Sequence, residues 1–148
     1  MPADGCRNPT RRHCETDPMT RALSAAGLEF VTERHLATFT SVGPGGVPHV
    51  TPVGFTWDAE HTIARVITSS SSAKARHVAD GATVVLCQVD GRHWLSLQGQ
   101  AVVTSDAAAV AEAVRRYAGR YRQPRINPRR VAIEIAIERI YGTATLLA

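Results

Sequence analysis

The chain has 148 residues, of which 44% are hydrophobic and 20% are charged, and its formal net charge is +4. These values are ordinary for about one globular domain, and the lack of any run of about 18 apolar residues excludes a membrane-spanning helix. Residues 1–18 lack the apolar core of a secretory signal, and three cysteines are too few for a disulfide framework, so we expect a cytoplasmic protein with no membrane partner.

The N-terminal residues, 1–18, contain three prolines and no hydrophobic periodicity, which predicts a disordered tail. The remainder, 19–148, is expected to form a single domain. Within it, the apolar residues of 20–35 recur near helical spacing, and Gly27 limits the expected helix to one or two short turns.

Runs of β-branched and alternating apolar residues predict six strands between strong turn signals. They are expected at 36–42, 47–58, 61–69, 82–90, 92–104 and 131–140. Pro48 and Pro52 imply that the second strand is an edge or a bulge, and Gly99 predicts a kink in the fifth. In the last strand the alternation is strict and predicts that Ile133 points inward and Glu134 outward.

Two helices are expected between the strands, one over 73–80 and one after Ser105, which can cap a helix with Asp106 in its first turn. The predicted fold class is therefore mainly β with short helices (α+β), arranged as an antiparallel six-stranded barrel. Side chains fill the interior of a barrel this small, so a cofactor would lie on its outside, with a second subunit as the natural cover.

Residues 64–80 form the stretch with the clearest binding chemistry. An apolar β-branched run is followed by four serines at 69–72 and by Lys74, the only lysine in the sequence. Hydroxyl and backbone N–H groups beside a cation can bind an anion, and Arg65 and Arg76 are close enough in sequence to contribute. The same pattern is typical of a serine-rich surface loop that caps a helix, and both interpretations stay open.

Positive charge concentrates at 115–130, which holds seven arginines and no acidic residue. Such a patch favours either nucleic acid or a small polyanion. The six histidines have no Cys or His partner at ligand spacing, so no metal site is expected, and no nucleophile motif is present. An anion site without acid–base or nucleophilic residues is typical of a carrier, or of an enzyme whose cofactor supplies the reactivity.

Four blocks of sequence carry a family resemblance. They are PHVTPVGF at 48–55, RVIT and SAK within 65–74, QVDGRHWLSLQG at 88–99 and RYRQPRINPRRVAIEIAIERI at 120–140. Over roughly residues 22–147 the chain resembles the split β-barrel, pyridoxamine 5'-phosphate oxidase-like superfamily of flavin and deazaflavin oxidoreductases. Within it, the chain is most similar to the actinobacterial branch that depends on coenzyme F420, of the biliverdin reductase type.

The resemblance implies a homodimer with two cofactor sites at the subunit interface, and no catalytic side chain, because the cofactor carries the hydride. The residues implied to hold the cofactor phosphate and its surroundings are Arg65, Thr68, Ser72, Lys74 and, at the outer edge, His77. The residues implied to lie against the deazaflavin ring are Thr51, Pro52 and Val53. Trp94 would reach the site from the other subunit, with a position in the hydrophobic core as the alternative.

The implied substrate-binding residues are Arg122, Arg125 and Arg129. They would face the carboxylates of a tetrapyrrole or the glutamate tail of the cofactor, with a plain solvated face as the alternative. The implied function is an F420H2-dependent reductase that transfers a hydride to a conjugated acceptor, with biliverdin, reduced to bilirubin, as the first choice.

Two alternatives accompany this function. An FMN-dependent oxidoreductase would share the barrel and the phosphate site, and a tetrapyrrole-binding protein without enzymatic activity would share the basic surface. Nucleic acid is not an expected partner.

Overall fold

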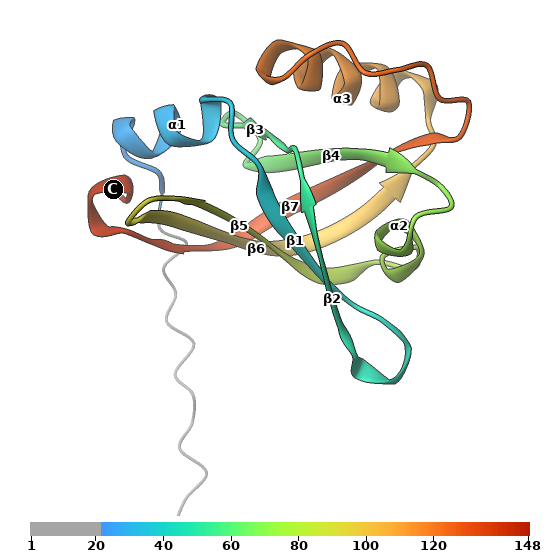
Figure 1. The fold of residues 1–148 in the computed structure, drawn as a ribbon, viewed down its shortest axis with the longest axis horizontal. Helices are drawn as coiled ribbons and strands as arrows, with labels where there is room; N and C mark the ends of the chain where they lie inside the picture. Colours follow the sequence, from blue (N-terminus) through green and yellow to red (C-terminus); the bar gives the residue numbers. More distant parts are fainter. Residues whose placement is uncertain (1–21) are drawn as a thin grey trace, which may run out of the picture.

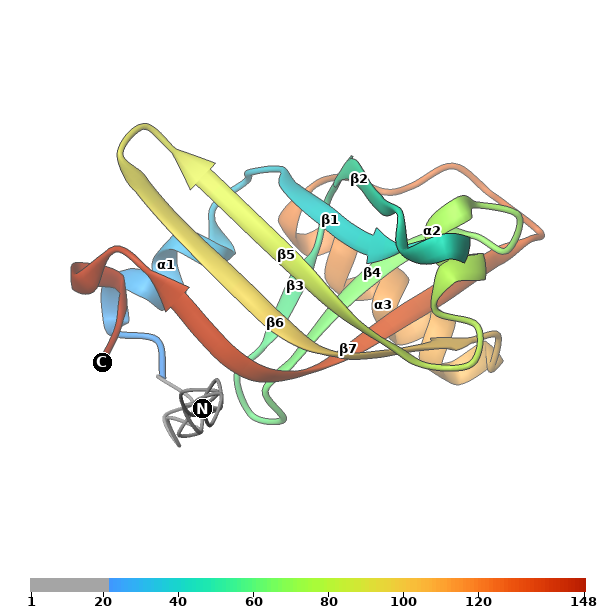
Figure 2. The same cartoon turned by 90° about the horizontal axis from the view of Figure 1, so that it is seen from below.

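The computed structural model describes residues 22–148, and the predicted tail, 1–18, lies outside the described residues. Seven strands form one curved antiparallel sheet in the order β2-β1-β5-β6-β7-β4-β3 (Figures 1 and 2). The strands are β1 (Ala37–Val42), β2 (Pro48–Val53), β3 (Thr56–Asp58), β4 (Ile63–Ser69), β5 (Ala82–Asp90), β6 (His93–Thr104) and β7 (Arg130–Gly142).

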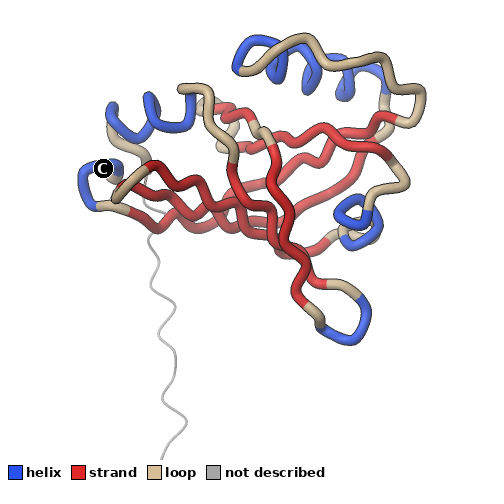
Figure 3. Tube along the Cα trace, in the orientation of Figure 1, coloured by secondary structure: helices blue, strands red, loops and turns tan. Residues whose placement is uncertain are grey.

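Three α-helices lie around the sheet (Figure 3). They are α1 (Ala25–Thr32), α2 (Ala73–His77) and α3 (Ala107–Arg120), and two 3-10 turns cover Pro44–Gly46 and Ala144–Leu146. The helix α3 packs on β3, β4 and β7, whereas α1 packs against the C-terminal turn (Figure 1). Across residues 22–148, no helix is long and apolar enough to cross a membrane.

The prediction of six strands is wrong by one, because the stretch 47–58 divides at Gly54 and Phe55 into β2 and β3. These two strands lie at opposite edges of the sheet, so the chain crosses from one edge to the other within two residues. Gly54 permits the crossing, because a Cβ atom there would lie 2.9 Å from the Tyr121 ring and 3.0 Å from the Tyr117 ring. Phe55 then buries its side chain in the core.

Other predictions about the strands are confirmed. The strand that contains Pro48 and Pro52 is an edge strand, where a missing N–H donor costs little. The pairing of β6 with β7 shifts its register between Gln98 and Gly99, where the kink was expected.

The hydrophobic core lies inside the curved sheet and follows the predicted alternation. In β7, Ile133 and Ile135 are fully buried, whereas Glu134 between them is only half-buried. Each fully buried aliphatic side chain of this size stabilises the fold by about 1.5–3 kcal/mol. Alternation along the last strand therefore both fixes its register and supplies much of the core.

The start of α3 differs from the prediction. Asp106, not Ser105, is the N-cap, and its Oδ2 accepts a hydrogen bond from the Ala109 N–H at 3.0 Å. A carboxylate in this position satisfies a free helix N–H and also interacts favourably with the helix dipole. Further along α3, Glu112 accepts hydrogen bonds from Arg115 at 2.6 Å and from Arg116 at 2.8 Å, which lower its pKa to about 2.

Candidate functional site

The segment predicted to bind an anion lines a cavity of about 290 Å³, which we call the Lys74 cavity. Its walls come from β2, β4, α2, α3 and the loop before β7. The lining residues are Pro52, Val53, Gly54, Ile67, Thr68, Ser69, Lys74, Tyr117, Pro124, Asn127 and Arg130. Folding therefore brings together four of the predicted site residues, namely Pro52, Val53, Thr68 and Lys74.

The loop that carries Lys74 is held by its own hydroxyl groups. Ser72 is the N-cap of α2, and its Oγ accepts hydrogen bonds from the Ala75 N–H at 3.2 Å and from the Thr68 hydroxyl at 3.0 Å. The Ser72 N–H donates to the Ser69 carbonyl at 3.0 Å. The helix cap expected as one interpretation of this loop is thus present, and it fixes the turn that presents Lys74 to the cavity.

Two cations meet in the Lys74 cavity without a carboxylate among its lining residues. The pairing of β4 with β7 sets Ser69 opposite Arg130, and this brings Arg130 to the same cavity as Lys74. In the described part of the chain, neither of the two cations has an acidic partner. A phosphate group fits this set, because Lys and Arg form charge-assisted hydrogen bonds with its oxygens.

The sequence prediction missed Arg130 and Asn127 as members of this site. Arg130 opens the last strand and Asn127 lies in the loop before it, more than fifty positions beyond Lys74 in the numbering. The positive charge of Arg130 can be read from the sequence, but its position beside Lys74 depends on which strand pairs with β4. That pairing is a property of the whole sheet, and no local pattern reports it.

A wall of two tyrosines, Tyr117 and Tyr121, stands beside the cavity, and Tyr117 lines it. The rings of Tyr117 and Tyr121 lie 4.8 Å apart with an angle of 31° between their planes. The Tyr121 hydroxyl donates to the His35 carbonyl at 2.6 Å and accepts from the Phe55 N–H at 3.1 Å. Burial raises the pKa of Tyr121, so the hydroxyl stays protonated as a donor. The wall is therefore rigid and stands beside the crossing at Gly54.

Arg120 anchors this wall to the barrel. Its guanidinium donates to the Glu33 carbonyl at 2.9 Å, the Phe55 carbonyl at 2.5 Å and Gln88 Oε1 at 2.8 Å. It also stacks over the Phe55 ring at 4.6 Å and the Tyr121 ring at 5.1 Å. Burial lowers the pKa of this guanidinium. Arg120 was predicted as part of a basic surface patch, but the structure uses it as an internal support.

Arg65 does not line the Lys74 cavity. Its guanidinium forms ion pairs with Asp58 at 2.9 Å and Glu134 at 3.5 Å. The part of β4 that lines the cavity is its C-terminal end, Ile67 to Ser69, and Arg65 lies before it in the strand. Binding of phosphate by Arg65 would require its guanidinium to leave both carboxylates.

Two further predicted residues flank the cavity without lining it. Thr51 lies in β2 next to Pro52, and its buried hydroxyl has no hydrogen-bond partner among the described residues. His77 ends α2, where its Nδ1 lies 2.8 Å from the Ser41 hydroxyl and its ring meets that of His49 edge-on at 5.3 Å. The orphaned Thr51 hydroxyl marks a place where a bound group would supply a missing partner.

Trp94 lies at the start of β6 and is 43% exposed, so the alternative of a core tryptophan is wrong. The turn between β5 and β6 lies at the opposite end of the sheet from α2 in both views (Figures 1 and 2). Within one copy of the chain, Trp94 is therefore remote from Lys74.

The basic segment 115–130 divides into two groups. Arg115, Arg116 and Arg120 are engaged by Glu112, Asp58 or carbonyl groups, as their hydrogen bonds and ion pairs show. The predicted substrate arginines, Arg122, Arg125 and Arg129, belong to the second group and are exposed, and the seventh arginine, Arg130, is half-buried and lines the Lys74 cavity. The patch is therefore smaller than the count of arginines implied.

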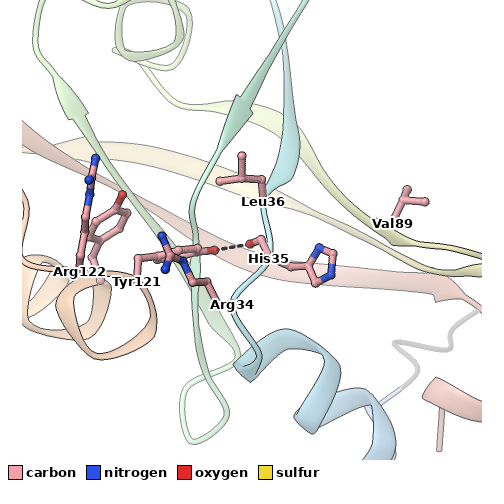
Figure 4. A pocket seen from close by; sticks show the side chains of 7 residues that line it. Arg34, His35, Leu36, Val89, Tyr121 and Arg122 are labelled. Carbon is pink, nitrogen blue, oxygen red and sulfur yellow. Dashed lines mark hydrogen bonds between the residues drawn. The ribbon is translucent and has the colours of Figure 1, made fainter.

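Of these exposed arginines, Arg122 lines a second and larger cavity of about 660 Å³, which we call the Arg34 cavity (Figure 4). The residues around it are Arg34, His35, Leu36, Val89, Tyr117, Tyr121 and Arg122. Tyr117 lines both cavities, so they meet at the tyrosine wall. The sequence prediction missed Arg34 and His35, which lie in the link between α1 and β1 and carry no motif.

Comparison with known proteins identifies the family to which this fold belongs. The family model described as pyridoxamine 5'-phosphate oxidase matches residues 23–144. A protein of Mycobacterium tuberculosis (strain CDC 1551 / Oshkosh) named F420H(2)-dependent biliverdin reductase is 53% identical over 128 residues, covering 86% of this chain and 93% of that protein.

Solved structures share the fold at lower identity. The conserved hypothetical protein Rv2991 from Mycobacterium tuberculosis has a TM-score of 0.70 at 21% identity, covering 83% of this chain and 86% of that one. A structure titled F420 Reductase has a TM-score of 0.64 at 20% identity, covering 76% of this chain and 94% of that one. With the family model matched over most of its length, the chain belongs to the pyridoxamine 5'-phosphate oxidase family.

Proposed function

We propose that this chain is an F420H2-dependent reductase that transfers a hydride to biliverdin and yields bilirubin. The observation that carries the proposal is the Lys74 cavity, where two cations without acidic partners adjoin the tyrosine wall and the apolar side chains of Pro52, Val53 and Ile67. A phosphate-bearing cofactor with a flat ring matches this division into a charged end and an apolar end. The relative from Mycobacterium tuberculosis, 53% identical, bears the name of the same activity.

The residues of this chain would hold and orient the reactants. Lys74 and Arg130 would bind the phosphate, with Thr68, Ser72 and Asn127 around it, while Pro52, Val53 and the backbone at Gly54 would border the ring. When bound, reduced F420 supplies the hydride. The lining of the Lys74 cavity includes no carboxylate, histidine or cysteine, so the chain would contribute position and charge there, and solvent or an arginine-held water would supply the proton.

A homodimer is part of this proposal. Val42 and Val50 on the β1–β2 hairpin are exposed, and so is Trp94 at the start of β6. A second copy would cover these apolar side chains and would bring its own Trp94 toward the cofactor. Sedimentation of the purified protein should give about twice the 15.9 kDa mass of one chain. An active monomer would contradict this part of the proposal.

The function is tested by anaerobic mixing of purified protein with F420H2 and biliverdin. We expect oxidised F420 and bilirubin to appear together, in equal amounts, at a rate proportional to protein concentration. FMN reduced in the same buffer is the control, because the Lys74 cavity could also hold the phosphate of FMN. Turnover with reduced FMN but not with F420H2 would favour the FMN-dependent alternative, and biliverdin binding without turnover would favour a binding protein.

Replacing Ser72 by alanine separates its role as a cap from a role in cofactor binding. Loss of the cap should reduce the free energy of unfolding by about 1 kcal/mol, because the Ala75 N–H loses its partner. Affinity for F420 should fall by less than about threefold if the hydroxyl acts only through the turn. Urea unfolding and fluorescence titration with F420 measure the two quantities. A large loss of affinity with unchanged stability would instead assign Ser72 a direct contact with the phosphate.

A further inference from the structure

The Arg34 cavity lies next to the proposed cofactor site but is separate from it. Its volume of about 660 Å³ falls within the range of about 300–1,000 Å³ that is usual for small-molecule sites. Arg34 and Arg122 reach it from distant parts of the sequence, one from the link before β1 and one from the end of α3. In the described part of the chain, neither of these arginines has an acidic partner.

The rest of the lining is apolar or aromatic. Leu36 is 60% exposed and Val89 is 56% exposed, so both present bare apolar surface to the cavity. In Figure 4, Arg34, Tyr121 and Arg122 lie on one side, and Leu36 and Val89 lie on the other. Asp90, next to Val89 in the chain, does not line the cavity, and its carboxylate lies 3.4 Å from His35 Nε2. The cavity thus combines two guanidinium groups that lack acidic partners with apolar and aromatic side chains.

We propose that the Arg34 cavity binds the carboxylates of the acceptor, with Arg34 and Arg122 as the groups that determine specificity. This inference rests on the proposed function and extends it to Arg34, which no motif indicated, beside Arg122, which the resemblance had implied. Guanidinium groups pair with carboxylates in a bidentate geometry, and Leu36, Val89 and Tyr117 would contact the conjugated part of the same molecule. Biliverdin has this combination, since it carries two propionate groups on a flat conjugated frame.

The glutamate tail of F420 is the other source of carboxylates. In F420 the phosphate lies between the ring and the tail. With the phosphate held by Lys74 and the ring bordering Val53 and Gly54, as proposed above, the tail would leave on the other side of Lys74. The Arg34 cavity lies beyond Tyr117, on the ring side of this arrangement. The position of the two cavities therefore favours the acceptor as the occupant of the Arg34 cavity.

The test compares Arg34→Gln and Arg122→Gln with the control Arg115→Gln. The control removes the same charge from a side chain of α3 that is 69% exposed and lines neither cavity. We expect each cavity variant to raise the KM for biliverdin about tenfold, because one charge-assisted hydrogen bond is lost. The control should change it less than twofold. With biliverdin dimethyl ester, which lacks the carboxylates, all four proteins should have the same KM.

The outcomes distinguish the two sources of carboxylate. A fall in F420 affinity of the cavity variants, with KM for biliverdin unchanged, would assign the cavity to the cofactor tail and overturn the proposal. Equal losses with biliverdin and its dimethyl ester would also overturn it, since the effect would not depend on carboxylates. Circular dichroism of each variant checks that the fold is intact.

Direct binding separates this proposal from the proposed function. The visible absorbance change of biliverdin on binding is measured without F420H2, in the parent protein and the variants. Binding that weakens in Arg34→Gln and Arg122→Gln supports the cavity assignment even where no F420H2 is consumed. Binding that is the same in the parent protein and both variants would overturn it, whatever the result of the activity assay.

Discussion

Replacing Lys74 by alanine is expected to weaken F420 binding at least about tenfold, with the fold intact. Lys74 lines the proposed cofactor cavity, and only Arg130 adds a second cation among its lining residues. A hydrogen bond to a charged group contributes about 1.5–3 kcal/mol, and the phosphate would lose one such bond. Fluorescence titration with F420 gives the affinity, and far-ultraviolet circular dichroism reports the fold.

Arg76→Ala is the matched control for Lys74→Ala. Arg76 lies two positions further along α2, is exposed, and directs its guanidinium to the Ser71 carbonyl. The Arg76→Ala substitution removes one positive charge from the same helix, so the long-range electrostatic effect on F420 binding is the same in the two variants. We expect its affinity for F420 to change less than about twofold. Unchanged affinity in Lys74→Ala, or equal losses in both variants, would contradict the assignment of Lys74 to the phosphate.

Replacing Asp58 by asparagine is expected to reduce the free energy of unfolding by about 3–5 kcal/mol at neutral pH. The Asp58 side chain is 3% exposed and lies 2.9 Å from Arg65 and 3.3 Å from Arg116. It also accepts hydrogen bonds from the N–H of His61 at 3.2 Å and from its ring at 3.0 Å. Without the carboxylate, Arg65 and Arg116 would stay in place but lose much of the negative charge that balances them. Urea unfolding at pH 7 measures the difference.

The same substitution has a defined pH dependence. Burial by itself would raise the pKa of Asp58, but hydrogen bonds from Arg65 and His61 and the charge of Arg116 outweigh it and hold the pKa well below its usual range. A pKa that is lower in the folded state means that stabilisation is complete above the unfolded pKa of about 3.9 and is lost as pH falls below it. The stability difference between the parent protein and Asp58→Asn should therefore be constant from pH 5 to 7 and shrink below about pH 4.

Glu112→Gln is the control for the Asp58 substitution. Glu112 also pairs with two arginines, but its side chain is 38% exposed, and an exposed pair contributes only about 0–1 kcal/mol. A loss of less than about 1 kcal/mol is expected. Equal losses of unfolding free energy in Asp58→Asn and Glu112→Gln would contradict the role given to burial. So would a stability difference between the parent protein and Asp58→Asn that grows as the pH falls.

Much of the fold was predictable because its signals are local. The alternation in 131–140, the proline-bearing edge strand and the serine-capped turn before Lys74 each depend on neighbouring residues, and the structure shows all three. The six-strand prediction failed at Gly54, because the segment reads as one continuous strand and the reason for its break is a contact with Tyr117 and Tyr121, over sixty positions away. A pattern in sequence cannot report a contact at that separation.

In the candidate site, too, the local features were predictable from the sequence and the contacts between distant segments were not. The sequence by itself determined that a strand, a serine turn and a lysine are adjacent in the chain, which is the local chemistry that an anion site needs. Only the tertiary structure decided which arginines lie at the Lys74 cavity. Pairing of β4 with β7 brings Arg130 to it. Ion pairs hold Arg65 outside the cavity, and Arg120 donates to carbonyl groups inside the fold. Charge is visible in a sequence, but whether a charge is free or already partnered depends on what the fold places beside it.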